Sequence, residues 1–401
     1  MELKKYKLGD LLQVTRGASL SGEYYATQGN YIRLTCGNFD YRNNCFKENQ
    51  SKDNIHYVGD FKEEFLLEKG DIITPLTEQA IGLLGSTARI PESGKYIQSQ
   101  DIAKIDCNES LLDKDFAFYL ISSACVKQQL SAAAQQTKIR HTSPDKIKEC
   151  TVWIPALDIQ KRIGRILTDI DNKIAINRQI NDNLEAMAKQ LYDYWFVQFD
   201  FPNEEGKPYK SSGGAMVWNE KLKREIPKEW MASNYTDLFT IGNGQTMPQN
   251  EGLVPAYGGN GIVKMVEISN YPACIIIGRV GANCGSIHYS KVPCWVSDNA
   301  ISICSKNDDW QPFLFYSLKL YNLSKNKGGS SQPLITHEAL KHLYFPMSEK
   351  HINQFCHIVN ELQDLIYSNQ QEILKFTKQR DELLPLLMNG QATINYHLSA
   401  Y

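Results

Sequence analysis

Two stretches of this 401-residue chain decide its fold: ALDIQKRIGRILTDIDNKIAINRQINDNLEAMAKQLYDYWF at residues 156–196 and SEKHINQFCHIVNELQDLIYSNQQEILKFTKQRDELLPLLM at residues 348–388. In both, apolar residues alternate at spacings of four and three, the 3.5-residue repeat that is typical of helices paired in a coiled coil. A shift of 192 residues superposes one stretch on the other. Each predicts a helix about 60 Å long, and the shared repeat predicts that the two helices pair.

The apolar repeat defines a seam along each predicted helix. Asn177 and Asn369 fall on it near the midpoints, and the same spacing includes Asn181, Ala188 and Arg380. A polar seam residue can fix the register of a coiled coil at some cost in stability. If the helices run antiparallel about a pseudo-two-fold axis, we expect Asn177 and Asn369 to meet at the centre; alternatively, each merely occupies a wet position. The residues predicted to pair are Ile163, Leu167, Ile170, Ile174, Asn177, Leu184, Leu191, Phe355, Val359, Leu362, Ile366, Asn369, Ile373, Phe376, Leu383 and Leu387.

The chain is also repeated outside these helices. LGDLLQVTRG at 8–17 returns as YTDLFTIGNG at 235–244, with Gly17 matching Gly244. Three further pairs of segments match in the same order: KGDIITPLTEQAIGLLGSTARI (69–90) with YPACIIIGRVGANCGSIHY (271–289), SQDIAKI (99–105) with SDNAISI (297–303), and DFAFYLISS (115–123) with PFLFYSLKL (312–320). Because β-branched runs bounded by glycine turns are typical of strands, each half predicts a strand-rich globular unit closed by a helix.

These patterns predict an α+β protein in which two repeated globular domains are joined by two long helices, paired as an antiparallel coiled coil with pseudo-two-fold symmetry. The segment between the halves is rich in Gly, Pro, Ser and charge and is expected to be a linker or extended connector. The predicted boundaries are 1–155 for the first domain, 156–198 for the first helix, 199–230 for the connector, 231–346 for the second domain, 347–390 for the second helix and 391–401 for the tail.

Length and composition exclude several classes of protein. The chain is too long for one ordinary core, and 42% hydrophobic and 22% charged residues are typical of globular proteins. No apolar run approaches the roughly 18 to 20 residues that span a bilayer, and the N-terminal MELKKYKLGDLLQV lacks a signal-peptide core. We therefore expect a cytoplasmic protein with no membrane partner. The net charge of −2 gives no overall basic signature of a nucleic-acid-binding protein.

Motifs for catalysis or metal binding are missing from the sequence. The ten cysteines form no C-x-x-C pair, so they are predicted to be reduced, mostly buried thiols rather than metal ligands. Cys274, Cys284, Cys294 and Cys304 recur at ten-residue steps, which we interpret as the coincidental spacing of strands. The sequence has no P-loop, dinucleotide fingerprint, nucleophile elbow or H-E-x-x-H motif. An Asp…Glu-x-Lys nuclease pattern in the connector is interpreted as chance.

Two polar, basic segments occupy equivalent places in the repeat, AAAQQTKIRHTSP at 132–144 and LSKNKGGSSQPLIT at 323–336. Lys and Arg suit phosphates, while Gln, Asn and Arg suit the edges of bases. Either segment alone would be interpreted as a solvated loop. Their repetition favours nucleic-acid recognition.

Glycine-rich turns in the second half suggest a further contact region. The segments at 255–264 and 277–286 place Asn260, Arg279 and Asn283 at predicted loop tips, where a glycine backbone can approach a ligand closely. Tight strand turns without a ligand are the alternative interpretation.

The second half resembles the specificity (S, HsdS) subunits of type I restriction-modification enzymes through PAYGGNGIV, IIIGRVGANCGSIHY, WVSDNAISI, SSQPLITHEALKHLYFP and the helix ending LLPLLMNGQ. The first half resembles them through YKLGDLLQVTRG, GDII, IRHTSPDKIKECTVWIPALDIQKRIGRIL and YDYWFVQFDF. The resemblance covers essentially the whole chain. The P-L-P-x-x-E-Q junction of the family is degenerate here, as IPALDIQ at 154–160 and FPMSEK at 345–350.

The resemblance implies a DNA sequence-specificity subunit. Each globular domain would be a target recognition domain that reads one half of a split, asymmetric site on double-stranded DNA, and the helix pair would act as the spacer. Partners would be two methyltransferase subunits and restriction subunits, which would supply S-adenosylmethionine, ATP and Mg²⁺. This chain would bind no cofactor or metal and would have no catalytic residue.

Candidate DNA contacts are chosen by residue type and loop position. They are Arg16, Arg33, Asn38, Gln135, Lys138 and Arg140 in the first domain and Tyr257, Asn260, Arg279, Asn283, Lys327 and Gln332 in the second. Two other functions remain open: a self-contained duplicated DNA-cleaving enzyme with its active site split between the halves, and a protein-binding scaffold without DNA recognition.

Overall fold

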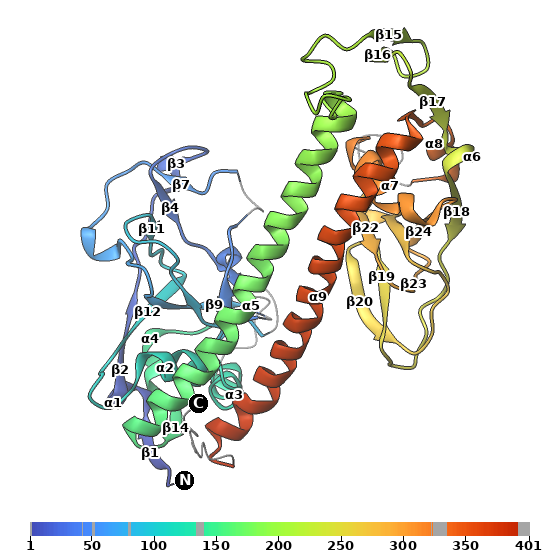
Figure 1. Ribbon diagram of the computed structural model, residues 1–401. Helices are drawn as coiled ribbons and strands as arrows, with labels where there is room; N and C mark the ends of the chain where they lie inside the picture. Colours follow the sequence, from blue (N-terminus) through green and yellow to red (C-terminus); the bar gives the residue numbers. More distant parts are fainter. Residues whose placement is uncertain are drawn as a thin grey trace. The chain divides into compact units, whose positions relative to one another are not determined.

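The computed structural model describes residues 2–41, 43–49, 53–78, 82–133, 140–321, 323 and 335–391. The chain forms two compact units (Figure 1). Unit 1 comprises Met1–Ala175 and Ile373–Tyr401, and unit 2 comprises Ile176–Glu372. Each long helix therefore contributes to both units, whereas the sequence predicted two separate spacer segments.

Unit 1 is built on a four-stranded antiparallel sheet in the order β10-β8-β12-β2. Alternate side chains of its central strands point to opposite faces, so Ile72 and Ile105 bury against the helices while Ile73 and Ile102 bury on the other face, with Tyr96. A second sheet, β11-β4-β7-β3, lies on that other face. The strands are β2 (Leu12–Arg16), β3 (Tyr25–Ala26), β4 (Tyr31–Arg33), β7 (His56–Tyr57), β8 (Ile72–Pro75), β10 (Ala88–Arg89), β11 (Tyr96–Ile97) and β12 (Ile102–Cys107).

Two helices of unit 1, α2 and α4, begin at residues whose side chains cap them. The side chain of Asp113 accepts a hydrogen bond from the backbone N–H of Phe116 at 2.9 Å, and Ser143 caps the next N-terminus in the same way, followed by Pro144. The elements are β1 (Lys4–Lys7), α1 (Leu8–Leu11), α2 (Lys114–Ile121), α3 (Ala124–Ala133), α4 (Pro144–Glu149) and β14 (Thr151–Ile154), and β1 pairs with β14.

Unit 2 repeats this architecture. Its main sheet has the order β22-β21-β24-β18, its second sheet the order β20-β19-β23, and β17 pairs with β25. The elements are β17 (Met231–Asn234), α6 (Tyr235–Leu238), β18 (Phe239–Asn243), β19 (Val254–Gly258), β20 (Gly261–Val266), β21 (Cys274–Gly278), η5 (Gly281–Asn283), β22 (Ile287–Ser290), β23 (Trp295–Val296), β24 (Ala300–Ser305), α7 (Gln311–Leu320), α8 (His337–Lys341) and β25 (Tyr344–Met347).

The sequence repeat is confirmed by topology. Strands β10, β8, β12 and β2 match β22, β21, β24 and β18 in order, and the parallel pair β4–β11 matches the parallel pair β19–β23. A Cβ on Gly17 would lie 2.3 Å from the carbonyl oxygen of Gln98, and one on Gly244 would lie 1.7 Å from that of Ser297. The matched glycines are therefore both required by a close approach of two backbones.

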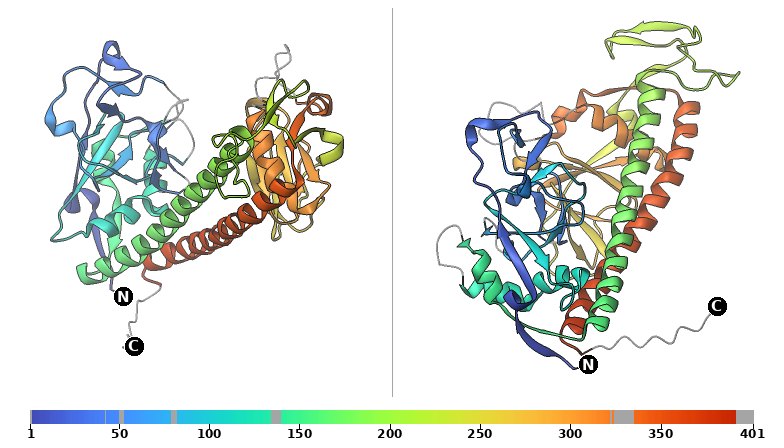
Figure 2. Two further views of the ribbon diagram at one scale, coloured as in Figure 1. Left: turned by 45° about the horizontal axis from the view of Figure 1, so that its top comes forward. Right: turned by 90° about the vertical axis from the view of Figure 1, so that its left-hand side faces the viewer.

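Helices α5 (Leu157–Tyr192) and α9 (Glu349–Met388) pair antiparallel within each unit, and the views in Figure 2 show the green α5 beside the red α9. In unit 1, Asp171 contacts Arg380 and Lys173 lies over the ring of Phe376. All of the residues predicted to pair are buried or half-buried. A single π turn, Asp193–Val197, follows α5.

The predicted meeting of the two midpoint asparagines is wrong. Asn177 donates to a carboxylate oxygen of Glu372 at 2.9 Å, and Asn369 donates to the side-chain oxygen of Asn181 at 2.9 Å. Both pairs lie in unit 2. The asparagines miss each other because the two helices are staggered by about one turn.

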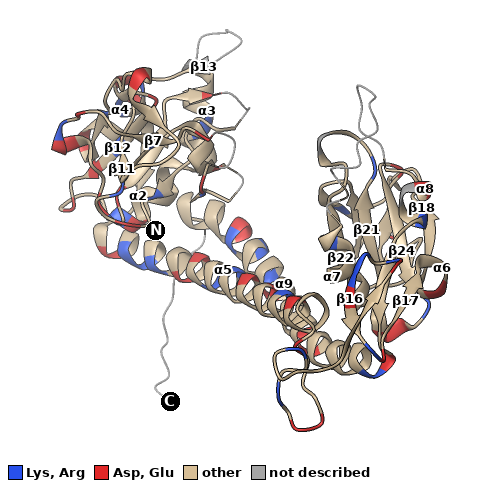
Figure 3. Ribbon diagram, turned by 90° about the horizontal axis from the view of Figure 1, so that it is seen from above, with Lys and Arg blue, Asp and Glu red and all other residues tan. Residues whose placement is uncertain are grey.

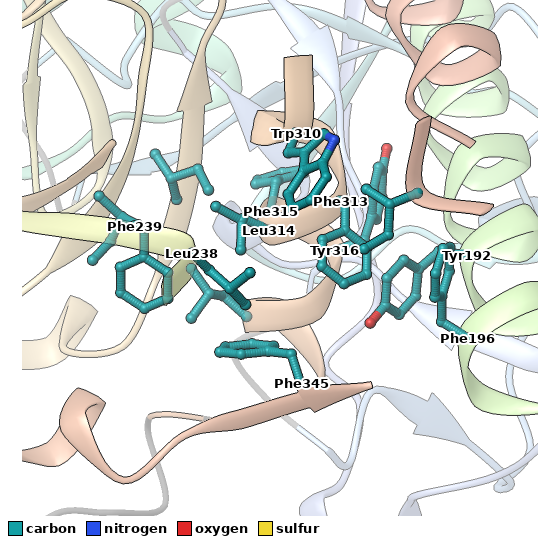
Figure 4. Close-up of a cluster of buried hydrophobic side chains, with 14 of the residues drawn as sticks. Tyr192, Phe196, Leu238, Phe239, Trp310, Phe313, Leu314, Phe315, Tyr316 and Phe345 are labelled. Atoms are coloured by element: carbon teal, nitrogen blue, oxygen red, sulfur yellow. The ribbon is translucent and has the colours of Figure 1, made fainter. Parts of the chain in front are cut away.

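The predicted connector is part of the core of unit 2. Phe199, Phe201 and Trp230 are buried, and the rings of Phe201 and Trp230 stack at 5.0 Å. Between them, β15 (Met216–Asn219) and β16 (Arg224–Pro227) form a hairpin. These aromatic residues belong to the large apolar cluster partly drawn in Figure 4, in which α7 side chains pack against the end of α5.

Candidate nucleic-acid interface

Three loops of unit 2 meet at one edge of its main sheet. They are the turn between β19 and β20, the loop between β21 and β22, and the loop that leads into β24. A Cβ on Gly259 would lie 3.6 Å from the carbonyl oxygen of Asn299, 3.6 Å from the Cα of Gly278 and 3.8 Å from the Cβ of Asn283. The three loops therefore converge around Gly259, and we call this the unit 2 edge.

Backbone hydrogen bonds hold the unit 2 edge. The N–H of Arg279 donates to the carbonyl oxygen of Asn299 at 2.9 Å, and the N–H of Ile335 donates to that of Arg279 at 3.0 Å. The Ser286 hydroxyl donates to the carbonyl oxygen of Gly259. A Cβ on Gly278 would lie 2.4 Å from the carbonyl oxygen of Asn283, so only glycine fits there.

The unit 2 edge presents amides and a guanidinium. Asn260, Asn283 and Asn299 are exposed and Arg279 is half-buried. Asn can form two hydrogen bonds to adenine, and Arg can bind guanine or phosphate. The structure thus brings together three of the predicted residues and adds Asn299, which sequence reasoning missed. The signal for it was its place directly before β24 in the repeated SDNAISI segment.

Tyr257, the fourth candidate in the described part of unit 2, does not face solvent. Tyr257 is 8% exposed, and burial raises its pKa to about 12. It packs among Cys274, Ile276 and Val296 in the apolar cluster behind the edge. Its selection as a DNA contact is therefore corrected to a role in the core.

Behind the turn between β19 and β20 lies a half-buried histidine that sequence reasoning also missed. The Cε1 of His288 would lie 3.4 Å from a Cβ on Gly261. Burial lowers the pKa of His288 below its ordinary value. The imidazole is therefore neutral at neutral pH.

In unit 1, two of the predicted DNA contacts serve the fold. Arg33 is 7% exposed, its guanidinium lies 3.8 Å from the ring of Tyr25, and it donates to the carbonyl oxygen of Asn54 at 3.2 Å. Asn38 is 2% exposed; its side chain accepts from the N–H of Thr35 and donates to the carbonyl oxygen of Lys47. Both selections are corrected, because the two side chains are buried inside the domain and make hydrogen bonds there.

The other predicted contacts of unit 1 are only partly described. Arg16 is exposed, and its Nε donates to the carbonyl oxygen of Gln100 at 2.8 Å. Arg140 belongs to β13 (Arg140–His141), which pairs with β9 (Thr77–Glu78). Gln135 and Lys138, and likewise Lys327 and Gln332 of unit 2, lie outside the described residues.

Glu78 stands at the start of the corresponding loop of unit 1, and it bonds backbone groups at the loop's other described end. Glu78 is buried, and its Oε1 accepts from the N–H of Gly82 at 2.7 Å and of Leu83 at 3.1 Å. The thiol of Cys36 contacts the Thr77 hydroxyl at 2.9 Å. The two units therefore share a scaffold but differ in the polar chemistry at this position.

Charge is mixed over both units, with Lys and Arg scattered among Asp and Glu (Figure 3). Among the described residues, no group of three or more His, Cys, Asp or Glu side chains is arranged to hold a metal ion. The helices within the described ranges include none that is long and apolar enough to cross a membrane.

Comparisons with known proteins agree with this geometry. A family model for the type I restriction modification DNA specificity domain matches residues 1–186 and 227–393. The chain is 23% identical over 347 residues to the type I restriction enzyme MjaIX specificity subunit of Methanocaldococcus jannaschii, a match that covers 78% of each chain. It is 27% identical over 199 residues to the type I restriction enzyme HindI specificity subunit of Haemophilus influenzae, covering 49% of this chain and 41% of that one.

A solved structure shares the fold. The S subunit of a type I restriction-modification system from M. genitalium superposes with a TM-score of 0.63, covering 98% of this chain and 97% of that one. The sequences are 18% identical. This likeness concerns the arrangement of elements.

Proposed function

The chain belongs to the family of type I restriction-modification DNA specificity proteins, and on this premise we propose that it selects the DNA sequence on which a type I restriction-modification complex acts, without catalysing a reaction itself. Each unit reads one half of a split site on double-stranded DNA. The two units would read different bases because the side chains on their edges differ.

One observation supports the proposal that each unit reads a different half of the DNA site. The same sheet topology occurs twice, and in unit 2 it presents Asn260, Arg279, Asn283 and Asn299 from three converging loops. Because base edges are read by a few side chains on a rigid support, each copy is suited to one short stretch of duplex.

The long helices support assembly with other subunits. Ile176 and Met187 of α5 are each 56% exposed, and Leu365 of α9 is exposed as well. Ile176 and Met187 are eleven residues apart and therefore lie on one face of α5, and exposed apolar side chains gathered on one surface mark a protein–protein contact. The partners we propose are two methyltransferase subunits and, for cleavage, restriction subunits. Those subunits would hold S-adenosylmethionine, ATP and Mg²⁺, and this chain would work beside the DNA in the cytoplasm.

The two alternatives raised from the sequence receive no support. A self-contained DNA-cleaving enzyme and a scaffold without DNA recognition both conflict with a family match that covers both halves of the chain. The nuclease-like pattern around Asp200 is explained structurally, since its carboxylate accepts hydrogen bonds from the N–H and hydroxyl of Ser211.

Mapping adenine methylation tests the DNA-reading role. The chain is expressed with its methyltransferase subunit in cells that lack other adenine methylation, and N6-methyladenine is mapped over the genome. A split motif is expected. Arg279→Ala or Asn283→Ala should relax one half of the motif by about 1–3 kcal/mol per lost bidentate contact and leave the other half unchanged.

Lys223→Ala is the matched control for Arg279→Ala. Lys223 lies in the β15–β16 hairpin and pairs with exposed Glu220, so its loss removes the same charge from a different surface. Methylation without any chain-dependent motif, or equal relaxation by the control, would refute the proposed function.

A further inference from the structure

Three of the ten-residue-spaced cysteines meet inside unit 2. The Sγ atoms of Cys274 and Cys294 lie 3.6 Å apart. The register that pairs Ile275 of β21 with Ile303 of β24 sets Cys274 against Cys304 at the next position. The cross-strand register therefore brings together three of the cysteines whose spacing the sequence analysis interpreted as coincidental.

The fourth member of the series is separate. Cys284 is buried against the large apolar cluster, and its thiol donates to the carbonyl oxygen of Arg279 at 3.3 Å. It provides an internal control, because it is a thiol of the same domain without a thiol neighbour among the described residues.

We propose that these three thiols form an oxidation site, in which peroxide entering at Cys304 produces a disulfide between Cys274 and Cys294. Cys274 and Cys294 are fully buried, whereas Cys304 is half-buried. The accessible thiol therefore meets the oxidant, and Cys274 lies between it and Cys294.

The chemistry balances with one peroxide. The Cys304 thiolate attacks peroxide, breaking its O–O bond and giving a sulfenic acid and hydroxide. The Cys274 sulfur attacks the Cys304 sulfur; its proton and the sulfenic hydroxyl leave as water. The Cys294 thiol gives its proton to the hydroxide, which forms the second water. The resulting Cys294 thiolate attacks the Cys274 sulfur, and Cys304 leaves as a thiolate. Two thiols and one peroxide thus yield one disulfide and two waters.

The electrostatics of the cluster favour this order. A hydrogen bond from Cys274 lowers the pKa of Cys304 and likewise that of Cys294, whereas the pKa of Cys274 is raised by hydrogen bonds with both. Because the thiolate is the reactive form, the entry thiol and the final attacking thiol are the two that ionise most readily.

The disulfide would act on the unit 2 edge. Cys274 begins β21, which ends at Gly278 beside Arg279, and Cys294 precedes β23, which leads to the loop of Asn299. Closing the sulfur–sulfur distance from 3.6 Å to about 2.05 Å draws these two strands together. This consequence for DNA reading rests on the proposed function, but formation of the disulfide does not.

Peptide mapping of the full chain tests the site. The folded protein is treated with hydrogen peroxide, alkylated with N-ethylmaleimide and digested with trypsin. Cleavage after Lys264, Arg279 and Lys291 places Cys274, Cys284 and the Cys294/Cys304 pair on three different peptides. We expect the Cys274 peptide joined to the third peptide, with fragment ions that assign the bond to Cys294.

Variants separate the roles of the thiols. Cys304→Ser should slow disulfide formation at least about tenfold, because the accessible thiolate is lost. Cys284→Ser should have no effect. Oxidation of Cys304 alone, or crosslinking only after denaturation, would overturn the proposal; the wild-type measurement stands even where a variant fails to fold. A mapped disulfide without any change in the methylated motif would leave the site intact and remove only its effect on the edge.

Discussion

In each unit a tyrosine of a short helix makes a hydrogen bond with a long helix at the equivalent position, α2 with α5 in unit 1 and α7 with α9 in unit 2. The bonded group of the long helix is charged in unit 1 and neutral in unit 2. In unit 1, the Tyr119 hydroxyl of α2 donates to one carboxylate oxygen of Asp171 on α5 at 2.7 Å. Arg380 of α9 donates to the other oxygen at 3.0 Å and also to Asp381. Arg380 is 8% exposed, so this is a largely buried, charged triad.

The equivalent positions of unit 2 carry no charge. Tyr316 of α7 matches Tyr119, and the 192-residue shift matches Gln363 to Asp171 and Ala188 to Arg380. The side-chain amide of Gln363 donates to the Tyr316 hydroxyl at 3.4 Å. Ala188 is fully buried.

This difference makes a duplicated helix pair asymmetric. With equal apolar seams, exchanged or slipped pairings of the helices would bury similar surfaces. A pairing that left Arg380 buried without Asp171 would cost several kcal/mol, because an unpaired buried charge is strongly unfavourable. We infer that the triad selects one register of the α5–α9 pair. The equivalent neutral residues of unit 2 contribute packing but do not select the register.

Removing the cation of the triad should have the largest effect. Arg380→Ala leaves the Asp171 carboxylate without its cation and should lower the free energy of unfolding by about 3 kcal/mol, the lower end for a broken buried pair because Asp171 keeps some solvent contact. Urea unfolding followed by circular dichroism measures it. Lys378→Ala, which removes an exposed cation of the same helix, is the control; equal losses in the two variants would contradict the inference.

Placing a carboxylate in unit 2 should be nearly as costly. Gln363→Asp introduces an anion where Ala188 stands in the place of Arg380, and Gln363→Asn is its neutral match in size. We expect Asp to destabilise by about 2 kcal/mol more than Asn at pH 7, because the buried anion lacks a cationic partner. The difference in stability between the Asp and Asn variants should disappear in acid, where the carboxyl is protonated. A constant gap from pH 7 to pH 4 would show that shape, not charge, is responsible.

The two tyrosine hydroxyls should differ in a smaller way. Burial and the neighbouring Asp171 raise the pKa of Tyr119, so it stays a protonated donor to a charged acceptor. Tyr119→Phe should cost about 1.5 kcal/mol and Tyr316→Phe about 0.5 kcal/mol, since hydrogen bonds to charged groups are the stronger. Thermal unfolding of both variants measures the difference, and equal shifts would remove the distinction between the units.

The helices were predictable because their repeat is local. The predicted stretch 348–388 differs from α9 by one residue at its start. The meeting of Asn177 with Asn369 was not predictable, because spacing within a helix says nothing about the stagger between two helices. The connector was predicted to be a linker because it is rich in Gly, Pro and Ser. Its three buried aromatic residues, Phe199, Phe201 and Trp230, nevertheless pack it into the core of unit 2.

Candidate contacts failed where burial depends on distant residues. Arg33 and Asn38 have side chains suited to bind DNA. In the folded domain, however, they donate to the carbonyl oxygens of Asn54 and Lys47, and the sequence does not show that these residues are neighbours. The close backbone approach in the glycine-rich turns was predictable because it is a local property of glycine, and their role as DNA contacts stays a prediction. The cysteine cluster was missed because the cross-strand register, rather than the ten-residue spacing itself, brings the thiols together.

The smallest expected difference lies at the described starts of the two long helices, where only α9 carries a half-buried titratable residue whose protonation makes stability depend on pH. His351 of α9 matches Ile159 of α5, and its ring lies 4.0 Å from that of Phe201 and 5.5 Å from that of Trp230. Burial, with a lesser contribution from Lys350, lowers the pKa of His351 to about 4.

Unit 2 should therefore lose stability in mild acid through His351. In the unfolded chain the imidazole takes up a proton as the pH falls through about 6.5, whereas the folded chain resists protonation down to about 4, so stability declines across that window. The melting temperatures of wild type and His351→Gln should converge as the pH drops from 7.5 to 4.5. His357→Gln changes an exposed histidine of the same helix and should stay parallel to wild type. Parallel curves for His351→Gln as well would mean that its burial does not make this end of the helix pair pH-sensitive.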